Sequence, residues 1–97
     1  MPHSDIGLKV KMTEKALRNR IIGDTNVPAE AITCYVPTHA RGKAEMMLGE
    51  MVTHNEGGWE EYGGRGTYHI TDVEEAVQFI ESNGGNLPFG FQDSNVN

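Results

Sequence analysis

The sequence predicts a small two-layer sandwich of the α/β (α+β) class, in which three helices cover one face of a three- to four-stranded sheet. Segments with an apolar residue at every second position alternate along the chain with segments whose apolar residues recur at helical spacing. Each strand-like segment also keeps one polar face, which indicates a sheet that helices cover on one side only. With 97 residues, the chain is expected to form a single domain, 1–97.

The first unit is expected to be a strand followed by a helix. Residues 6–12, IGLKVKM, alternate apolar and polar side chains, which predicts a half-buried strand. Thr13 is the expected N-cap of a helix over residues 14–22, EKALRNRII, and Gly23 is its expected stop. The turn-forming residues of 23–30, GDTNVPAE, should separate this unit from the next.

The second unit repeats this order. Residues 31–36, AITCYV, are rich in β-branched and aromatic side chains, and they predict a strand with Cys34 on its buried face. Residues 39–54 predict the longest helix, because their apolar residues recur at helical spacing. The open face of the sheet, suited to association, would carry Lys9, Lys11, Thr33, Tyr35, Thr67 and His69.

The third unit follows a glycine-rich loop at 55–66. Residues 66–70, GTYHI, predict a short strand, and Thr71 with Glu74 forms the capping-box pattern that opens a helix. That helix should end at the Asn-Gly-Gly that follows it. An extended C-terminal tail is expected at 86–97, because a proline within it restricts the segment to an edge strand or an arm.

Cysteine content and hydropathy indicate the compartment. Cys34 is the only cysteine, which excludes an internal disulfide and the zinc sites that need several thiolates. We therefore expect a reducing, cytoplasmic location. Charges interrupt residues 1–11 where a signal peptide needs an apolar core, and no apolar run approaches the roughly 20 residues that span a bilayer. No membrane association is expected.

The net charge of −6 is unevenly distributed along the chain. Residues 1–23 contain five Lys or Arg and two Asp or Glu, a local charge of +3, whereas residues 56–97 contain one Arg and eight Asp or Glu, a local charge of −7. Such a chain can pair its own ends, pair head to tail with a second copy, or present an acidic face to a basic partner. A general nucleic-acid binder would show the opposite balance, so direct nucleic-acid binding is not expected.

The stretch HNEGGWEEYGGRGTYHI, residues 54–70, raises two ligand hypotheses. Phosphate-binding glycine loops run into a helix, but these glycines run into a strand and enclose two glutamates that would repel the anion. The side chains suited to a metal are those of His54, Glu56, His69, Glu60 and Glu61. They lack the tight helical spacing of metal motifs, so exposed histidines are the main expectation, and the sequence leaves metal binding undecided. No cofactor is expected.

The same stretch is better suited to contact a protein. The candidate partner-binding residues are Trp59, Glu60, Glu61, Tyr62, Arg65 and Tyr68. Aromatic side chains anchor interfaces, and glycines beside them allow adaptation. The sequence therefore predicts a small acidic, non-enzymatic interaction protein, an inhibitor or adaptor that engages a protein with a basic surface through its acidic C-terminal half and its glycine-rich aromatic loop. Compact acidic proteins of this type are common among viral antagonists of host defence, and self-association into a homo-oligomer fits the same features.

An alternative hypothesis places an anion or small ligand at the expected junction between the second strand and the long helix. The candidate anion-binding residues are Thr38, His39, Arg41 and Lys43. A helix N-terminus with free N–H groups and cationic side chains is a favourable place for an anion. The glycine-rich loop would then close over the ligand as a lid. Under this alternative the protein would be a small-ligand binder or an enzyme.

Overall fold

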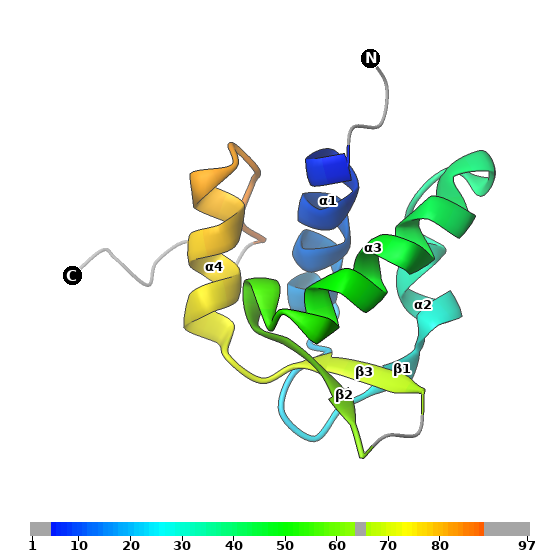
Figure 1. Ribbon diagram of the computed structural model, residues 1–97. Coiled ribbons are helices and arrows are strands. Elements are labelled where there is room, and N and C mark those ends of the chain that lie inside the picture. Colours follow the sequence, from blue (N-terminus) through cyan, green and yellow to red (C-terminus); the bar gives the residue numbers. More distant parts are fainter. Residues whose placement is uncertain (1–4, 64–65, 89–97) are drawn as a thin grey trace.

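The computed structural model describes residues 5–63 and 66–88. This part of the chain folds into an α+β domain in which four α-helices lie on one side of a three-stranded antiparallel sheet (Figure 1). In chain order, with η marking a 3-10 helix, the elements are α1 (Asp5–Arg18), β1 (Val27–Pro28), α2 (Ala29–Thr33), η1 (Thr38–Ala40), α3 (Arg41–Thr53), η2 (Glu56–Gly58), β2 (Trp59–Tyr62), β3 (Thr67–Ile70) and α4 (Val73–Ser82). The predicted fold class is confirmed.

The sheet is small and has the strand order β1-β3-β2. β2 and β3 form a hairpin in which Trp59 pairs with Ile70 and Tyr62 pairs with Thr67. β1 adds only two residues to the other edge of β3. Beyond them, the backbone N–H of Ile70 donates to the carbonyl of Ile21 across 3.0 Å, so the segment after α1 also lies along β3.

The core lies between the helices and the sheet. α1 stands at its centre and contacts α2, α3 and α4 (Figure 1). Trp59 and Ile70 close the core from the sheet side, and both are fully buried. Burying a large apolar side chain contributes about 1.5–3 kcal/mol relative to leaving it exposed. The buried apolar side chains of the core are therefore the main source of the domain's stability.

The strand predicted at residues 6–12 is wrong, since this segment is the first half of α1. The two-residue alternation arises because α1 is covered by other helices on more than one side, so Val10 is buried as well as Leu8 and Met12, which share the opposite face of the helix. Thr13 lies inside the helix, where its hydroxyl donates to the carbonyl of Lys9 across 2.8 Å. It is therefore not an N-cap, and the helix ends at Arg18, before the predicted stop.

The strand predicted at residues 31–36 is also wrong, since residues 29–33 form the short helix α2. Ile32 and Val36 are buried, and a spacing of four residues suits one face of a helical turn as well as one face of a strand. Cys34 is the C-cap of α2 and is exposed, so it is not the core residue that the strand interpretation implied.

The second half of the chain follows the prediction more closely. α3, β3 and α4 are confirmed at residues 41–53, 67–70 and 73–82, although α3, with 13 residues, is not the longest helix, since α1 has 14. The N-cap of α4 is Asp72 rather than Thr71, because Oδ1 of Asp72 accepts the backbone N–H of Glu75 across 3.1 Å.

The predicted open sheet face does not exist as one surface. Two of its residues lie on α1, and His69 is buried with its Nδ1 against the carbonyl of Gly23.

Candidate interaction surface

The glycine-rich stretch predicted as a single loop contains two ordered elements, η2 and β2. Gly58 has a φ of +79°, and a Cβ built on it would lie 2.3 Å from the carbonyl oxygen of Asp72. The carbonyl of Gly58 accepts the backbone N–H of Thr71 across 2.8 Å. Glycine is needed at this position because the chain entering β2 lies directly against the backbone that enters α4. The stretch therefore joins the hairpin to α4.

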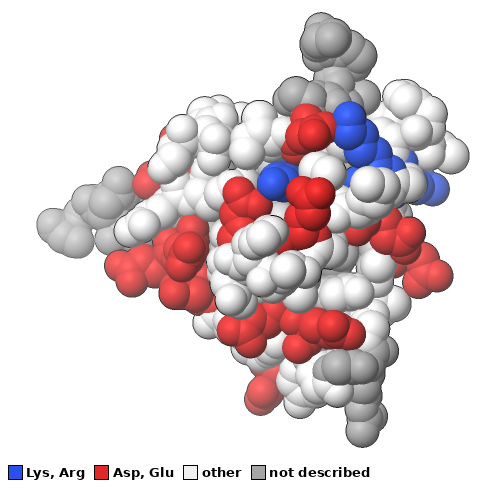
Figure 2. All heavy atoms as spheres, in the orientation of Figure 1, with Lys and Arg blue, Asp and Glu red and all other residues white. Residues whose placement is uncertain are grey.

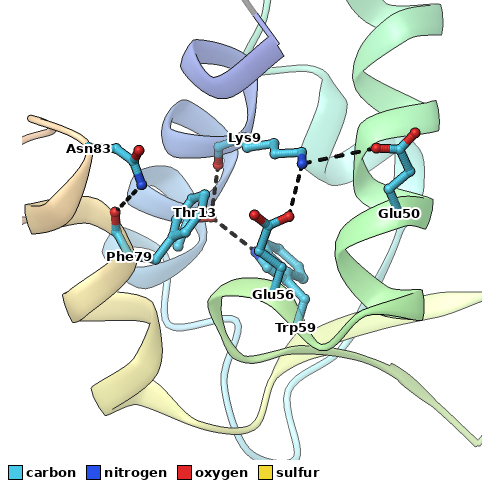
Figure 3. Close-up of polar contacts among 7 residues, drawn as sticks. All are labelled: Lys9, Thr13, Glu50, Glu56, Trp59, Phe79 and Asn83. Carbon is cyan, nitrogen blue, oxygen red and sulfur yellow. Dashed lines mark hydrogen bonds and ion pairs between the residues drawn. The ribbon is translucent and has the colours of Figure 1, made fainter.

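Trp59 belongs to the core and not to an exposed binding surface, which corrects its predicted role as a partner-binding residue. Its side chain is fully buried, and its indole Nε1 donates to Oγ1 of Thr13 across 3.1 Å. Figure 3 shows the indole pointing from β2 toward α1, beneath Glu56. The aromatic ring that seemed the best interface anchor instead fixes the hairpin to the first helix.

Lys9 joins α1 to η2 on the same side of the molecule. Its Nζ lies 2.9 Å from Oε1 of Glu56 and 4.0 Å from Oε1 of Glu50 (Figure 3). The Lys9 side chain is 15% exposed and that of Glu56 is 34% exposed, so the pair is partly shielded from water. This contact neutralises one carboxylate next to the hairpin.

The other predicted partner-binding residues divide between the two faces of the hairpin. Glu60 and Tyr62 alternate with Glu61 along β2, and all three are exposed. The ring of Tyr62 packs edge-on against His69 with centroids 5.2 Å apart. Tyr68 is half-buried against the core, and Arg65 lies outside the described residues. The structure thus brings Glu60 and Tyr62 together on one face.

Two hollows lie along α4, one beside the start of the hairpin and one beside η2. The first, of about 300 Å³, is lined by Asn55, Gly58, Glu60, Thr71, Asp72 and Glu75. The second, of about 230 Å³, is lined by Glu56, Gly57, Glu75, Gln78, Phe79, Ser82 and Asn83. Glu75 lines both hollows, and the half-buried ring of Phe79 lines the second.

These hollows lie within a wider surface that we call the acidic face. It consists of the exposed carboxylates of α4 with its N-cap and of β2, where they lie on both faces of the hairpin: Glu60, Glu61, Asp72, Glu74, Glu75 and Glu81. The described residues of 56–63 and 66–88 contain no Lys or Arg, and none of these six carboxylates forms an ion pair with a described residue. Figure 2 shows carboxylates across the region of α4 and along the hairpin, with the cations of this view gathered near the top.

The sequence predicts contact through the acidic C-terminal half as a whole, which includes the carboxylates of α4, but it singles out only Glu60 and Glu61 among them as candidate contact residues. Two signals were available: the count of −7 over residues 56–97, and the amphipathic pattern of the final helix, whose polar side must face water.

The predicted anion site at the start of α3 has its cations already engaged. Nε of Arg41 donates to the carbonyl of Val36 across 3.3 Å and its Nη2 donates to that of Cys34 across 3.4 Å. Nζ of Lys43 pairs with Asp5 at 2.7 Å. Both side chains therefore stabilise local structure, Arg41 by capping the end of α2.

The lid that this alternative requires lies at the wrong end of the helix. Thr38 and His39 are exposed in η1, just before α3. Gly57 and Gly58, which belong to the glycine-rich loop expected to form the lid, follow the C-terminal end of α3, which is 13 residues long and therefore spans about 20 Å. Figure 1 shows the two ends of α3 far apart. The geometry gives this alternative no support.

The residues considered for a metal do not converge. His54 is exposed at the C-terminal end of α3, Glu56 pairs with Lys9, and His69 is buried on the other side of the hairpin. Within 5–63 and 66–88, no group of three or more His, Cys, Asp or Glu side chains is arranged to hold a metal ion.

No protein-family model, curated protein or solved structure matches this chain. The fold and the surface define its class: a small α+β domain with an acidic face whose carboxylates form no ion pair within residues 5–63 and 66–88. In the described part of the chain, no helix has the length and apolar character needed to cross a membrane.

Proposed function

We propose that this chain is a small non-enzymatic interaction protein, an inhibitor or adaptor, that engages a basic protein surface through its acidic face. The observation that carries this proposal is the absence of any Lys or Arg from the described residues of 56–63 and 66–88, which supply all six carboxylates of the face. A surface of one sign raises the encounter rate with an oppositely charged partner and repels partners of its own sign.

The shape of the face suits basic side chains. Glu60 and Glu75 flank a hollow whose floor includes the backbone at Gly58, and Phe79 offers an apolar contact in the adjoining one. Lysine and arginine combine a charged head with an apolar stem, so a carboxylate rim above an apolar contact matches both parts. Tyr62, 41% exposed, adds an aromatic contact at the edge of the hairpin.

The class of partner follows from this chemistry. Basic grooves are typical of proteins that bind nucleic acid, and a compact acidic protein can occupy such a groove in place of the nucleic acid. Viral antagonists of host defence use this strategy, and the proposal extends it to this chain by analogy of type. A cytoplasmic site of action fits the single cysteine, Cys34, which is exposed and has no partner for an internal disulfide.

The test uses three forms of the chain as baits and compares the proteins that each bait captures from an extract of the native host. The wild-type chain is compared with Glu60→Gln/Glu74→Gln/Glu75→Gln, which removes charge from the acidic face, and with Asp24→Asn/Glu30→Gln/Glu45→Gln. The second triple variant changes the net charge equally but alters exposed carboxylates outside the face. Captured proteins are identified by mass spectrometry and their binding is then remeasured with purified components.

We expect basic proteins to bind the wild type and the control and to bind the face variant at least tenfold more weakly. Added salt should weaken wild-type binding, because exposed charge pairs are screened within about 8–10 Å at physiological ionic strength. Equal capture by the face variant and the control would overturn the proposal, as would partners whose contact surface is acidic.

A further inference from the structure

A second charged surface lies on α1 and has the opposite sign. Lys11, Lys15 and Arg18 follow the helical spacing of four and three residues, so they lie on one side of α1. We call them the basic stripe. None of the three side chains forms an ion pair with a described residue, whereas Lys9 and Lys43 are both paired. The stripe therefore has no ion-pair partner within the described chain, and it keeps a net positive charge although Glu14 lies beside it on the same side of α1.

The basic stripe lies on a different side of α1 from Lys9, which reaches Glu56 of η2 next to the hollows of the acidic face. At about 100° per residue, the three stripe residues lie roughly 180–240° around the helix axis from Lys9. Lys15 and Arg18 instead border a hollow that the segment after α4 also lines. Within the described chain no stripe residue pairs with a carboxylate of the acidic face, but two copies can bring these two surfaces together.

The two surfaces also match in length. On α4, Glu74 and Glu81 are seven residues apart, as are Lys11 and Arg18 on α1. Seven residues of helix correspond to about 10 Å in both cases. A helix from each of two copies can therefore align several opposite charges at once.

From this complementarity we infer that the occupant of the acidic face is a second copy of this chain, docked through its basic stripe. The inference rests on the proposed function, because it uses the same acidic face and names what covers it. The contact is head to tail, so a pair of copies keeps one free basic stripe on one copy and one free acidic face on the other, and longer chains form as concentration rises. Because its energy comes mainly from exposed charges, the contact weakens with salt.

The test uses two complementary variants, each lacking one half of the contact. Lys11→Gln/Lys15→Gln/Arg18→Gln keeps the acidic face and loses the stripe. Glu60→Gln/Glu74→Gln/Glu75→Gln keeps the stripe and loses charge on the face. Molar mass is measured by light scattering and sedimentation, at low salt and again at about 0.5 M salt, where the Debye length falls to only a few ångströms.

We expect the wild type to exceed its monomer mass of 10.7 kDa increasingly with concentration at low salt, and to return to it at high salt. Each variant alone should remain monomeric. An equimolar mixture of the two should form a complex of twice the monomer mass and grow no further, since only one matched pair of surfaces remains.

The control Asp24→Asn/Glu30→Gln/Glu45→Gln should associate like the wild type, which separates the face from the effect of net charge. A monomeric wild type at millimolar concentration and low salt would overturn the inference, and so would a mixture that forms no complex. In either case, continued capture of a different basic protein by the acidic face leaves the proposed function standing. Loss of that capture together with intact self-association would overturn the proposed function alone.

Discussion

The indole Nε1 of Trp59 lies 3.1 Å from Oγ1 of Thr13, and both residues are fully buried. Thr13 in turn donates its hydroxyl proton to the carbonyl of Lys9. The hydroxyl thus accepts from the hairpin and donates within α1, which satisfies every polar atom of a contact that joins residues 46 positions apart.

Replacing this hydroxyl should be costly only when the indole N–H is present. Thr13→Val keeps the side-chain volume but leaves the N–H without an acceptor, so we expect a loss of about 1–3 kcal/mol in the free energy of unfolding. In a Trp59→Phe background the same substitution should cost much less, because no donor is left unsatisfied. Urea unfolding followed by far-UV circular dichroism measures both. Equal costs in the two backgrounds would mean that the hydrogen bond contributes nothing.

Alanine substitutions at Gly58 and Gly66 distinguish the cost of backbone strain from the cost of a steric clash. Their φ angles are +79° and +78°, but a Cβ on Gly58 would lie 2.3 Å from Asp72 whereas a Cβ on Gly66 would have nothing within 4 Å. Gly66→Ala should therefore cost only the strain of a left-handed residue, about 1–2 kcal/mol. Gly58→Ala should cost about 1–3 kcal/mol more, from the enforced displacement of backbone. Thermal unfolding of both variants checks this order, and similar losses would contradict it.

The cap of α4 gives a prediction that distinguishes the structure from the sequence pattern. Asp72 accepts the N–H of Glu75, so Asp72→Ala should destabilise the protein by about 1 kcal/mol. Asp72→Asn should retain most of the stability. If Thr71 were the N-cap, as the capping-box pattern suggested, Thr71→Ala would be the more damaging change. Chemical unfolding of the three variants decides between the two positions.

How far the sequence predicted the structure depends on what surrounds each segment. In α4, with Val77 and Ile80 buried and Glu74 and Glu81 exposed, one side faces the core and the other faces water, so its period is readable. α1 contacts three helices, so its buried residues spread over roughly half of its circumference and leave only the side of Lys11 and Arg18 exposed. When single polar residues interrupt the apolar residues of such a helix, its sequence shows the same two-residue alternation as a strand.

The candidate site was predictable in charge and not in geometry. Glu60 and Glu61 were expected at the surface from their charge alone, because an unpaired carboxylate is costly to bury. The exposure of Trp59 could not be predicted in this way, since a lone tryptophan among glycines is equally compatible with an exposed interface anchor and with a core residue. Its burial depends on contacts with Thr13 and α1 that lie far away in the sequence.

Lys9 links the stability of the domain to the charge of its acidic side. Lys9→Met should cost about 1 kcal/mol or less of unfolding free energy, because the ion pair with Glu56 is partly shielded and Met retains the apolar stem. A double-mutant cycle with Glu56→Gln isolates the pair. Its coupling energy should shrink as salt is added, and a coupling independent of salt would contradict an electrostatic origin.

The same substitution should change binding in the opposite direction from stability. Without Lys9, the carboxylate of Glu56 is no longer neutralised, and it lines the hollow that also contains Glu75. Lys9→Met should therefore bind a basic partner more tightly than the wild type at low salt, although the domain itself is less stable. Lys43→Met, which breaks the exposed pair with Asp5 and removes the same charge, should leave affinity closer to that of the wild type, because Lys43 does not border the hollows. Titration calorimetry of the three proteins against one purified basic partner tests this. Equal affinities for the two variants would show that net charge, and not the local arrangement at Glu56, controls the encounter.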